Sequence, residues 1–351
     1  MKIEWQKFLN DAGAEIQDGK VESFGNPTRE RQIIHSGNTL CDLSHYGLIA
    51  AYGEDTVDFL QGQFTNDITE VNETHSQFSA YCTPKGRMLA NFRIFKRGET
   101  LYLMLPYPLL EPVLNRLRMF VMRSKVTLED ASDALMQFGF SGPQADKQLK
   151  NITESIPCDI DDCIQYDNYS IIRTHGTEPR FEIYGDLNAM RKLWQSLDVD
   201  ATPVGAPIWE LLNIQSGIPV ITAETVEAFV PQMANMSLIG GINFKKGCYT
   251  GQEIVARMHY LGKLKKRMYH ISIDCKEAPK AGDKIFAENS TAGTGTGTIV
   301  SAELNADGVY EALAVIQIAD VEGQTLQLHD EEGPVVKILE LPYAFVKADS
   351  K

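Results

Sequence analysis

Apolar residues in the first 262 positions switch repeatedly between the spacing of a strand and that of a helix. Residues 88–95 and 100–106 are strand-like on either side of an Arg97-Gly98 turn, which predicts a β-hairpin. Within residues 109–123 the apolar side chains recur at helical spacing, and a strand follows at once. A second strand–helix pair is predicted over residues 181–197. Because there is little sign of a parallel sheet, we expect α+β sandwich domains.

From Lys263 onward the pattern changes to short strands separated by Gly, Asp and Asn turns. The alternation in residues 267–275 places Tyr269, Ile271, Ile273 and Cys275 on one face. Further strand-like runs follow at residues 281–288, 293–304, 310–319 and 335–341. The GTGTGT run at residues 293–298 lacks the lysine and the following helix of a phosphate-binding loop, so it is interpreted as part of a strand. We therefore expect a small C-terminal β-barrel.

Length and composition fit a globular protein of two or three domains, with 351 residues and 43% hydrophobic content. No run approaches the roughly 18 apolar residues that span a bilayer, and the N-terminus lacks the apolar core of a signal peptide. We expect a soluble, cytoplasmic protein that does not contact membranes. The six cysteines are widely spread, and the one close pair, Cys158 and Cys163, lacks further ligands, so neither a disulfide framework nor a metal site is predicted.

The formal net charge of −14 argues against general nucleic-acid binding, and so against direct tRNA binding. Positive charge is nevertheless concentrated in two segments, residues 85–125 with a balance of +7 and residues 245–267 with a balance of +6. Two basic segments in an acidic protein suit an anionic ligand. The two basic segments are equally well explained as ordinary solvent-exposed faces, unless they lie next to each other in the folded protein.

The segment GGINFKKGCYTGQEIVARMHYLG, residues 240–262, places Cys248 just before a predicted helix. Thr250 and Glu253 have the spacing of a capping box ahead of an apolar stripe, and Gly262 supplies the stop, so the helix is predicted over residues 251–260. A helix N-terminus and neighbouring lysines both favour thiolate over thiol. A reactive or metal-coordinating Cys248 is one interpretation, and a small buried cysteine is the other.

The run FKKGCYTGQEIVAR closely resembles the Lys-Gly-Cys-Tyr-x-Gly-Gln-Glu signature of the YgfZ family, whose members are relatives of the glycine-cleavage aminomethyltransferase, the T-protein. Four further blocks resemble the family in the family's order: CDLSHYGLIAAYGEDTVDFLQGQFTNDI, SQFSAYCTPKGRMLANFRIF, LLNIQSGIPVI and AFVPQMANMSLIGGINF. The signature positions are Lys246, Gly247, Cys248, Tyr249, Gly251, Gln252 and Glu253, with Arg257 on the helix that follows. The resemblance covers residues 40 to 262.

The resemblance implies three domains around a central channel that binds tetrahydrofolate or a folate derivative. We expect a folate-binding α+β domain from residues 30–125 with 205–262, a second from residues 1–29 with 126–204, and a barrel from residues 263–345. It also implies a role in assembling or repairing iron–sulfur proteins, among them radical enzymes that modify tRNA by thiomethylation. The matching family cysteine is regarded as important, which makes Cys248 the expected reactive centre.

Departures from the T-protein weaken the alternative of an aminomethyltransferase or other one-carbon transferase. In the T-protein a pair of aspartates occupies the positions of Ala90 and Asn91, and an amide cannot accept a proton as a carboxylate does. The T-protein glutamate that binds the pterin aligns with Gln215, which can hydrogen-bond a pterin without charge assistance. We expect Asn91 and Gln215 to contact folate.

Three other residues have two interpretations each. Asp67 follows a predicted helix and either reaches the folate channel or makes an ordinary turn, which is slightly favoured. Lys85 and Arg87 either face the carboxylates of folate or lie on an exposed hairpin loop. Arg257 is interpreted as the partner of Glu253 in a surface ion pair.

A tRNA-binding adaptor that uses the basic segments is a third possible function.

Overall fold

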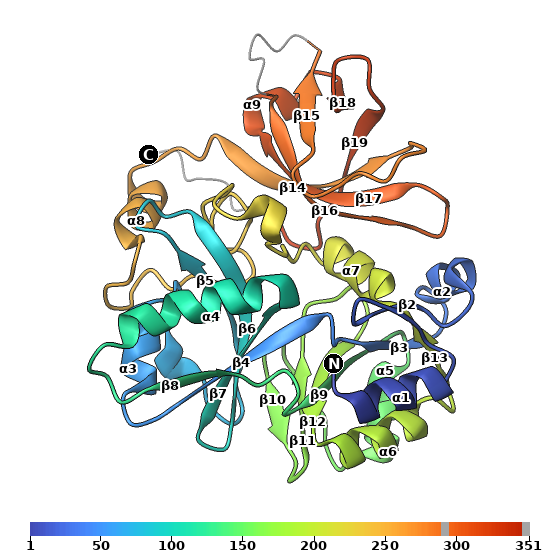
Figure 1. The fold of residues 1–351 in the computed structure, drawn as a ribbon. Coiled ribbons are helices and arrows are strands. Elements are labelled where there is room, and N and C mark those ends of the chain that lie inside the picture. The colour runs from blue at the N-terminus through green and yellow to red at the C-terminus, as the bar shows by residue number, and fades with distance from the viewer. Residues whose placement is uncertain (289–294, 346–351) are drawn as a thin grey trace.

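The computed structural model describes residues 1–288 and 295–345, and those residues form three packed units and an N-terminal β-ribbon (Figure 1). The α-helices within the described residues are α1 (Ile3–Asp11), α2 (Pro27–Ile33), α3 (Thr56–Gln61), α4 (Tyr107–Val121), α5 (Ala145–Ile152), α6 (Leu187–Leu197), α7 (Ala206–Gln215), α8 (Gln252–Tyr260) and the short α9 (Ile318–Val321). Single 3₁₀ turns cover Ile68–Glu70 and Ala223–Thr225. The ribbon pairs β1 (Glu15–Gln17) with β2 (Lys20–Ser23).

The first unit is a five-stranded sheet in the order β5-β6-β7-β4-β8. Its strands are β4 (Tyr46–Tyr52), β5 (Gln77–Cys82), β6 (Met88–Arg97), β7 (Thr100–Pro106) and β8 (Thr127–Asp130). The predicted hairpin is confirmed, since Arg97 pairs with Thr100 where β6 turns into β7. Helix α4 buries Leu110, Leu114 and Leu117 against this sheet, as its apolar period predicts.

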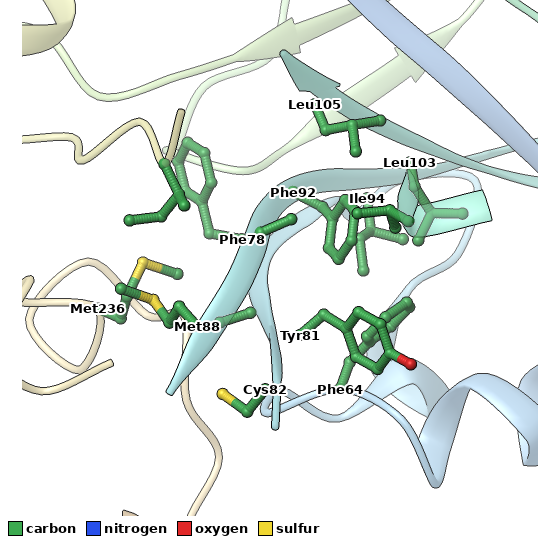
Figure 2. Close-up of a cluster of buried hydrophobic side chains, with 14 of the residues drawn as sticks. Phe64, Phe78, Tyr81, Cys82, Met88, Phe92, Ile94, Leu103, Leu105 and Met236 are labelled. Atoms are coloured by element: carbon green, nitrogen blue, oxygen red, sulfur yellow. The ribbon is translucent and has the colours of Figure 1, made fainter. Parts of the chain in front are cut away.

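The core of this unit extends beyond the sheet to the loop that precedes the signature. Figure 2 shows aromatic and aliphatic side chains of β5, β6 and β7 packed together, with Met236 lying beside Met88. Asn235 also donates from Nδ2 to the carbonyl of Met268 at 2.9 Å, which ties the same loop to the C-terminal unit. The residues leading to the signature are therefore held on two sides.

The second unit is a six-stranded sheet in the order β10-β11-β12-β9-β3-β13, with α1, α5 and α6 packed on one face. Its strands are β3 (Asn38–Asp42), β9 (Met136–Ser141), β10 (Cys163–Gln165), β11 (Tyr169–Arg173), β12 (Arg180–Gly185) and β13 (Ala201–Val204). The predicted strand–helix pair is confirmed as β12 and α6. Pairing is antiparallel except between β3 and β13, which run parallel.

The third unit is the closed barrel β14-β17-β16-β15-β18-β19, which confirms the predicted C-terminal barrel. Its strands are β14 (Lys266–Ile273), β15 (Lys284–Ala287), β16 (Gly297–Leu304), β17 (Tyr310–Gln317), β18 (Leu326–Leu328) and β19 (Val335–Leu339). Ile271 and Ile273 face its core. Met268 is buried because it packs into the core of the first unit, and the buried His270 contacts the carboxylate of Glu311 on β17. Gly293 and Thr294 of the GTGTGT run lie outside the described residues.

The sheets exchange strands across the expected domain boundaries. Strand β3, expected in the first domain, lies in the six-stranded sheet, and β8, expected in the second, is an edge of the five-stranded sheet. Strand β8 begins within two residues of the predicted boundary at residue 125, and β3 begins about eight residues after the one at residue 30. The local hydrophobic pattern does not indicate which sheet a strand joins. Helix α7 lies where the units meet, in contact with β2, β3, β16 and β17 (Figure 1).

Candidate functional site

Lys246 turns inward from the signature loop and closes the end of helix α3. Its Nζ donates to the carbonyl oxygens of Gln61, Phe64 and Asn66 at 2.9, 2.8 and 2.7 Å. Carbonyls at a helix C-terminus lack intrahelical partners and carry partial negative charge, so a lysine there stabilises the helix end. Burial lowers the pKa of the Lys246 ammonium to about 8, and Asp67 opposes that shift. Lys246 is therefore a structural anchor of the loop.

Asn243 sets the direction of the two signature lysines. Its Oδ1 accepts hydrogen bonds from the backbone N–H groups of Lys245 and Lys246 at 2.8 and 3.1 Å. This Asx turn sends the Lys245 side chain to solvent and the Lys246 side chain into the protein. The sequence interpretation placed both ammonium groups beside the thiol, whereas the Nζ of Lys246 is bound by carbonyls.

Tyr249 is the second buried anchor. Its ring is 8% exposed, and the ammonium of Lys246 lies 5.3 Å from the ring centroid. Burial, reinforced by Cys82, raises the pKa of the Tyr249 hydroxyl well above its ordinary value. Because residues 246 and 249 are both buried, the two residues between them, Gly247 and Cys248, are pushed outward as a short exposed arch.

Cys248 is exposed at the top of this arch, which excludes the small buried cysteine as an interpretation. Helix α8 begins at Gln252, close to the predicted start. The predicted capping box is wrong: the cap is Gly251, whose φ of +86° lies in the left-handed region, and neither Thr250 nor Glu253 caps the helix with its side chain. Instead Gln252 donates from Nε2 to the carbonyl of Gly247 at 3.3 Å and braces the arch.

Gly251 is required at the cap because the 83–87 turn packs against it. A Cβ at residue 251 would lie 2.5 Å from the carbonyl oxygen of Thr83, and one at Gly86 would lie 2.9 Å from Cβ of Ile254. The tight contact brings one end of the first basic segment against the second. By contrast, a Cβ at Gly247 would meet no atom within 4 Å.

Most lysines and arginines of the first basic segment, residues 85–125, form ion pairs or hydrogen bonds with other residues of the protein. Arg93, Lys96 and Lys125 form ion pairs with carboxylates. Arg87 donates to the carbonyl of Ala228 at 2.6 Å, and Arg118 donates to that of Leu128. Lys85 is exposed on the turn. This segment is therefore mostly structural, and the interpretation as an anion site is weakened for residues 85–125.

Asn91 lies on β6 in the wall of a central cavity of about 30 Å³, between the two sheets. It donates from Nδ2 to the carbonyl of Pro219 at 2.8 Å, and its Oδ1 accepts from the N–H of Ile221 at 3.0 Å. Both ends of the amide thus hold the strap of residues 218–221 in place. A volume of this size holds about one water, far below the several hundred Å³ of a cofactor site.

Two buried arginines contact residues that line the cavity. The guanidinium of Arg93 is stacked 3.9 Å from the ring centroid of Phe78 and forms ion pairs with Glu182 and Asp161. Burial alone would lower the pKa of Arg93, but Glu182 and Asp161 more than offset it, so the pKa is raised. Arg180 donates to Oδ1 of Asn213 at 2.8 Å, and burial lowers its pKa to about 10.

Gln215, Asp67 and Arg257 lie apart from this cavity. Gln215 ends α7 and donates to the carboxylate of Glu311 at 3.3 Å, on the barrel. Asp67 Oδ1 accepts from Thr69 Oγ1 at 2.6 Å, which favours the turn interpretation and lowers the pKa of Asp67. Arg257 and Glu253 are both exposed, and among the described residues no ion pair joins them, so that predicted pair is wrong.

No helix in residues 1–288 and 295–345 is long and apolar enough to cross a bilayer. The expectation that membranes play no part remains an expectation.

Residues 16–246 match the family model described as the GCVT N-terminal domain. The chain is 32% identical to the tRNA-modifying protein YgfZ of Photorhabdus laumondii subsp. laumondii over 309 residues, covering 87% of this chain and 92% of that protein. It is 34% identical to the protein of the same name from Hamiltonella defensa subsp. Acyrthosiphon pisum over 298 residues, covering 84% and 88%.

The fold is similar to that of glycine cleavage system aminomethyltransferase T from Bartonella henselae, with a TM-score of 0.79, 17% identity and 97% coverage of both chains. At this identity the likeness shows the fold alone. The signature, the ordered blocks and the near-complete coverage of the YgfZ proteins agree with one another. The chain therefore belongs to the YgfZ family, within the proteins that carry a GCVT N-terminal domain.

Proposed function

We propose that this protein is a folate-binding accessory factor for the assembly or repair of iron–sulfur proteins, acting in tRNA modification, with Cys248 as its reactive centre. The observation that carries the proposal is an exposed thiol on an arch fixed by two buried neighbours, Lys246 and Tyr249. A thiol held in this way can meet a protein partner or a cluster without a change in the surrounding fold. The tRNA-modifying name of the relatives supports the setting.

The place proposed for tetrahydrofolate is the region between the two sheets, next to Asn91. The T-protein-like fold supports this placement, while the cavity of about 30 Å³ requires the strap of residues 218–221 to move before a pterin enters. Gln215 would contact the ligand only if its hydrogen bond to Glu311 is released. Lys85 remains a candidate for the glutamate tail because its side chain is exposed.

Complementation tests the cysteine. In a strain lacking its own family member, Cys248→Ala and Cys248→Ser should abolish rescue while the melting temperature stays within about 1 °C of wild type, because the exposed side chain packs against little. Cys158→Ser is the matched control, since Cys158 is also exposed. Full rescue by Cys248→Ala would rule out the cysteine as the reactive centre.

One-carbon transfer is the second candidate function, favoured by the shared fold. Formation of methylene-tetrahydrofolate from an aminomethyl donor would identify it. We expect no turnover, because residues 90 and 91 offer no carboxylate and the Asn91 amide is occupied at both ends. Calorimetric titration with tetrahydrofolate tests binding separately from turnover.

A further inference from the structure

A second hollow lies at the edge of strand β5, on the far side of that strand from the central cavity. It has a volume of about 480 Å³, within the range of small-molecule sites. Successive residues of a strand point to opposite faces, so Phe78 lines the central cavity while its neighbour Gln77 lines this pocket. The two spaces are therefore separate, and we call the second one the β5-edge pocket.

The wall of the β5-edge pocket is held by hydrogen bonds that Asn66, Thr65 and Asn243 make with backbone carbonyls. Asn66 donates from Nδ2 to the carbonyls of Phe78 and Gly240 at 2.9 and 2.7 Å. Thr65 donates from Oγ1 to the carbonyl of Gly241 at 2.7 Å, and its own carbonyl accepts from the N–H of Asn243 at 3.0 Å. The loop that leads into the signature is thereby fixed against the edge of the sheet, and the pocket is built between them.

Gln77 is the unusual residue of this pocket. Its side chain is 3% exposed, yet neither the amide nitrogen nor the amide oxygen has a hydrogen-bond partner among the described residues. A buried amide without partners costs about 1–3 kcal/mol, so such groups are normally satisfied by protein, water or ligand. Both amide atoms are closed to solvent, so the Gln77 side chain has to rotate toward the pocket before a ligand that presents an acceptor and a donor side by side can satisfy them.

Aromatic rings and a free cation complete the pocket. The rings of Phe244 and His259 are stacked, with 3.7 Å between their centroids and 12° between their planes. The ring of Tyr260 packs edge-on against His259, with 78° between the two planes. Lys245 lines the pocket, is exposed, and forms no ion pair within the part of the chain that the structure describes. Two carboxylates also line the pocket, Glu70 and Asp161, and Asp161 is paired with Arg93.

We propose that the β5-edge pocket binds a purine nucleotide, with an adenine base against the aromatic pair and Gln77, and the phosphate toward Lys245. Glutamine pairs bidentately with adenine through N6–H and N7, which supplies one donor and one acceptor. Aromatic side chains stack on bases, and a lysine supplies the charge for phosphate. This site is independent of both Cys248 and the central cavity, so it goes beyond the proposed function.

Calorimetric titration of the full chain with AMP, CMP and inorganic phosphate tests the base and the phosphate separately. We expect saturable AMP binding that is at least fivefold tighter than CMP, and none measurable for phosphate. Gln77→Leu should weaken AMP about tenfold without lowering the melting temperature, because it removes an unpartnered amide. His259→Ala, at an exposed position, should also weaken AMP about tenfold.

Lys245→Gln should weaken AMP several-fold, while Lys263→Gln, an exposed lysine of the same basic segment outside the pocket, should change it less than twofold. A triadenylate RNA distinguishes the source of the nucleotide. Tighter binding than AMP with the same sensitivity to Gln77→Leu indicates a strand of RNA, and weaker binding indicates a free nucleotide. Unchanged affinity in both Gln77→Leu and His259→Ala, or equal binding of AMP, CMP and phosphate, would overturn the proposal.

Discussion

The arch of Cys248 and the strand segment of Ala90 and Asn91 belong to neighbouring parts of the fold but use their polar groups in opposite ways. At the arch, buried neighbours bond to the protein and leave the thiol of Cys248 facing solvent. On β6, the amide of Asn91 is bonded at both ends and buried, and Ala90 has no polar group. The first region is arranged to meet something outside the protein, and the second is arranged as structure.

This difference indicates that the segment of Ala90 and Asn91 serves packing, whereas the arch leaves a nucleophilic side chain accessible. The strap of residues 218–221 lies against β6 and is held there by both ends of the Asn91 amide. The four predictions that follow test the contrast, from the largest expected change in stability to the smallest.

Replacing Lys246 should have the largest effect. Lys246→Met leaves the carbonyl of Gln61 at the end of α3, and those of Phe64 and Asn66 in the loop that follows, without their donor. This should lower the free energy of unfolding by about 3 kcal/mol. Urea unfolding, together with hydrogen exchange of α3 amides, measures the loss. Lys245→Met, at the exposed neighbour, should stay within about 0.5 kcal/mol of wild type. Equal effects of the two changes would show that Lys246 is not an anchor.

The two signature glycines provide a matched pair. Gly251→Ala adds a Cβ 2.5 Å from a backbone oxygen at a φ of +86°, so we expect a loss of about 2 kcal/mol. The Cβ added by Gly247→Ala meets no atom within 4 Å, so this change should alter the free energy of unfolding by less than about 0.5 kcal/mol. Thermal unfolding checks both. If Gly251→Ala left the stability unchanged, the 83–87 turn would have to move away from residue 251 at little cost, and the close contact would not be a constraint.

Restoring an acid on β6 tests whether that strand is now structural. Asn91→Asp replaces the donor to the Pro219 carbonyl with a carboxylate oxygen, which should cost about 1.5 kcal/mol and create no aminomethyl transfer. The exposed change Asn10→Asp is the control for the added charge. If Asn91→Asp gained transfer activity without loss of stability, the division between the two regions would fail.

The pH dependence of stability sharpens the account of Lys246. Its folded pKa is lowered to about 8 from the ordinary 10.5, so between these values the unfolded chain binds more protons than the folded one. Stability from this group should therefore rise with pH, by about 1 kcal/mol between pH 7 and pH 9. Lys246→Met should lose this increment when both proteins are compared by urea unfolding. The opposite slope would contradict the buried ammonium.

Much of the fold was predictable because local patterns determined it. The β6–β7 hairpin, helices α4, α6 and α8, and the barrel follow from apolar spacing and turn residues. The strand exchange of β3 and β8 was not, because sheet membership depends on long-range pairing.

Within the site, the exposure of Cys248 could be suggested from sequence only as one of two interpretations. The inward turn of Lys246 depends on the Asx turn of Asn243, and an Asn two residues before a lysine does not by itself indicate such a turn. The capping box failed because a close approach of the 83–87 turn requires glycine at the cap, a tertiary effect that overrides the local motif. The β5-edge pocket had no sequence signal, since Gln77 and His259 are far apart in the chain.

The hydrogen bonds of Asn91 to residues 219 and 221 have a kinetic consequence. A ligand of pterin size cannot enter a space of about 30 Å³ by diffusion alone, so its arrival must wait for the strap to open. The observed association rate would then level off at high ligand concentration, at the frequency of opening. Weakening the hydrogen bonds of Asn91 to the strap would speed both entry and escape of the folate proposed to bind there, without any change at the thiol.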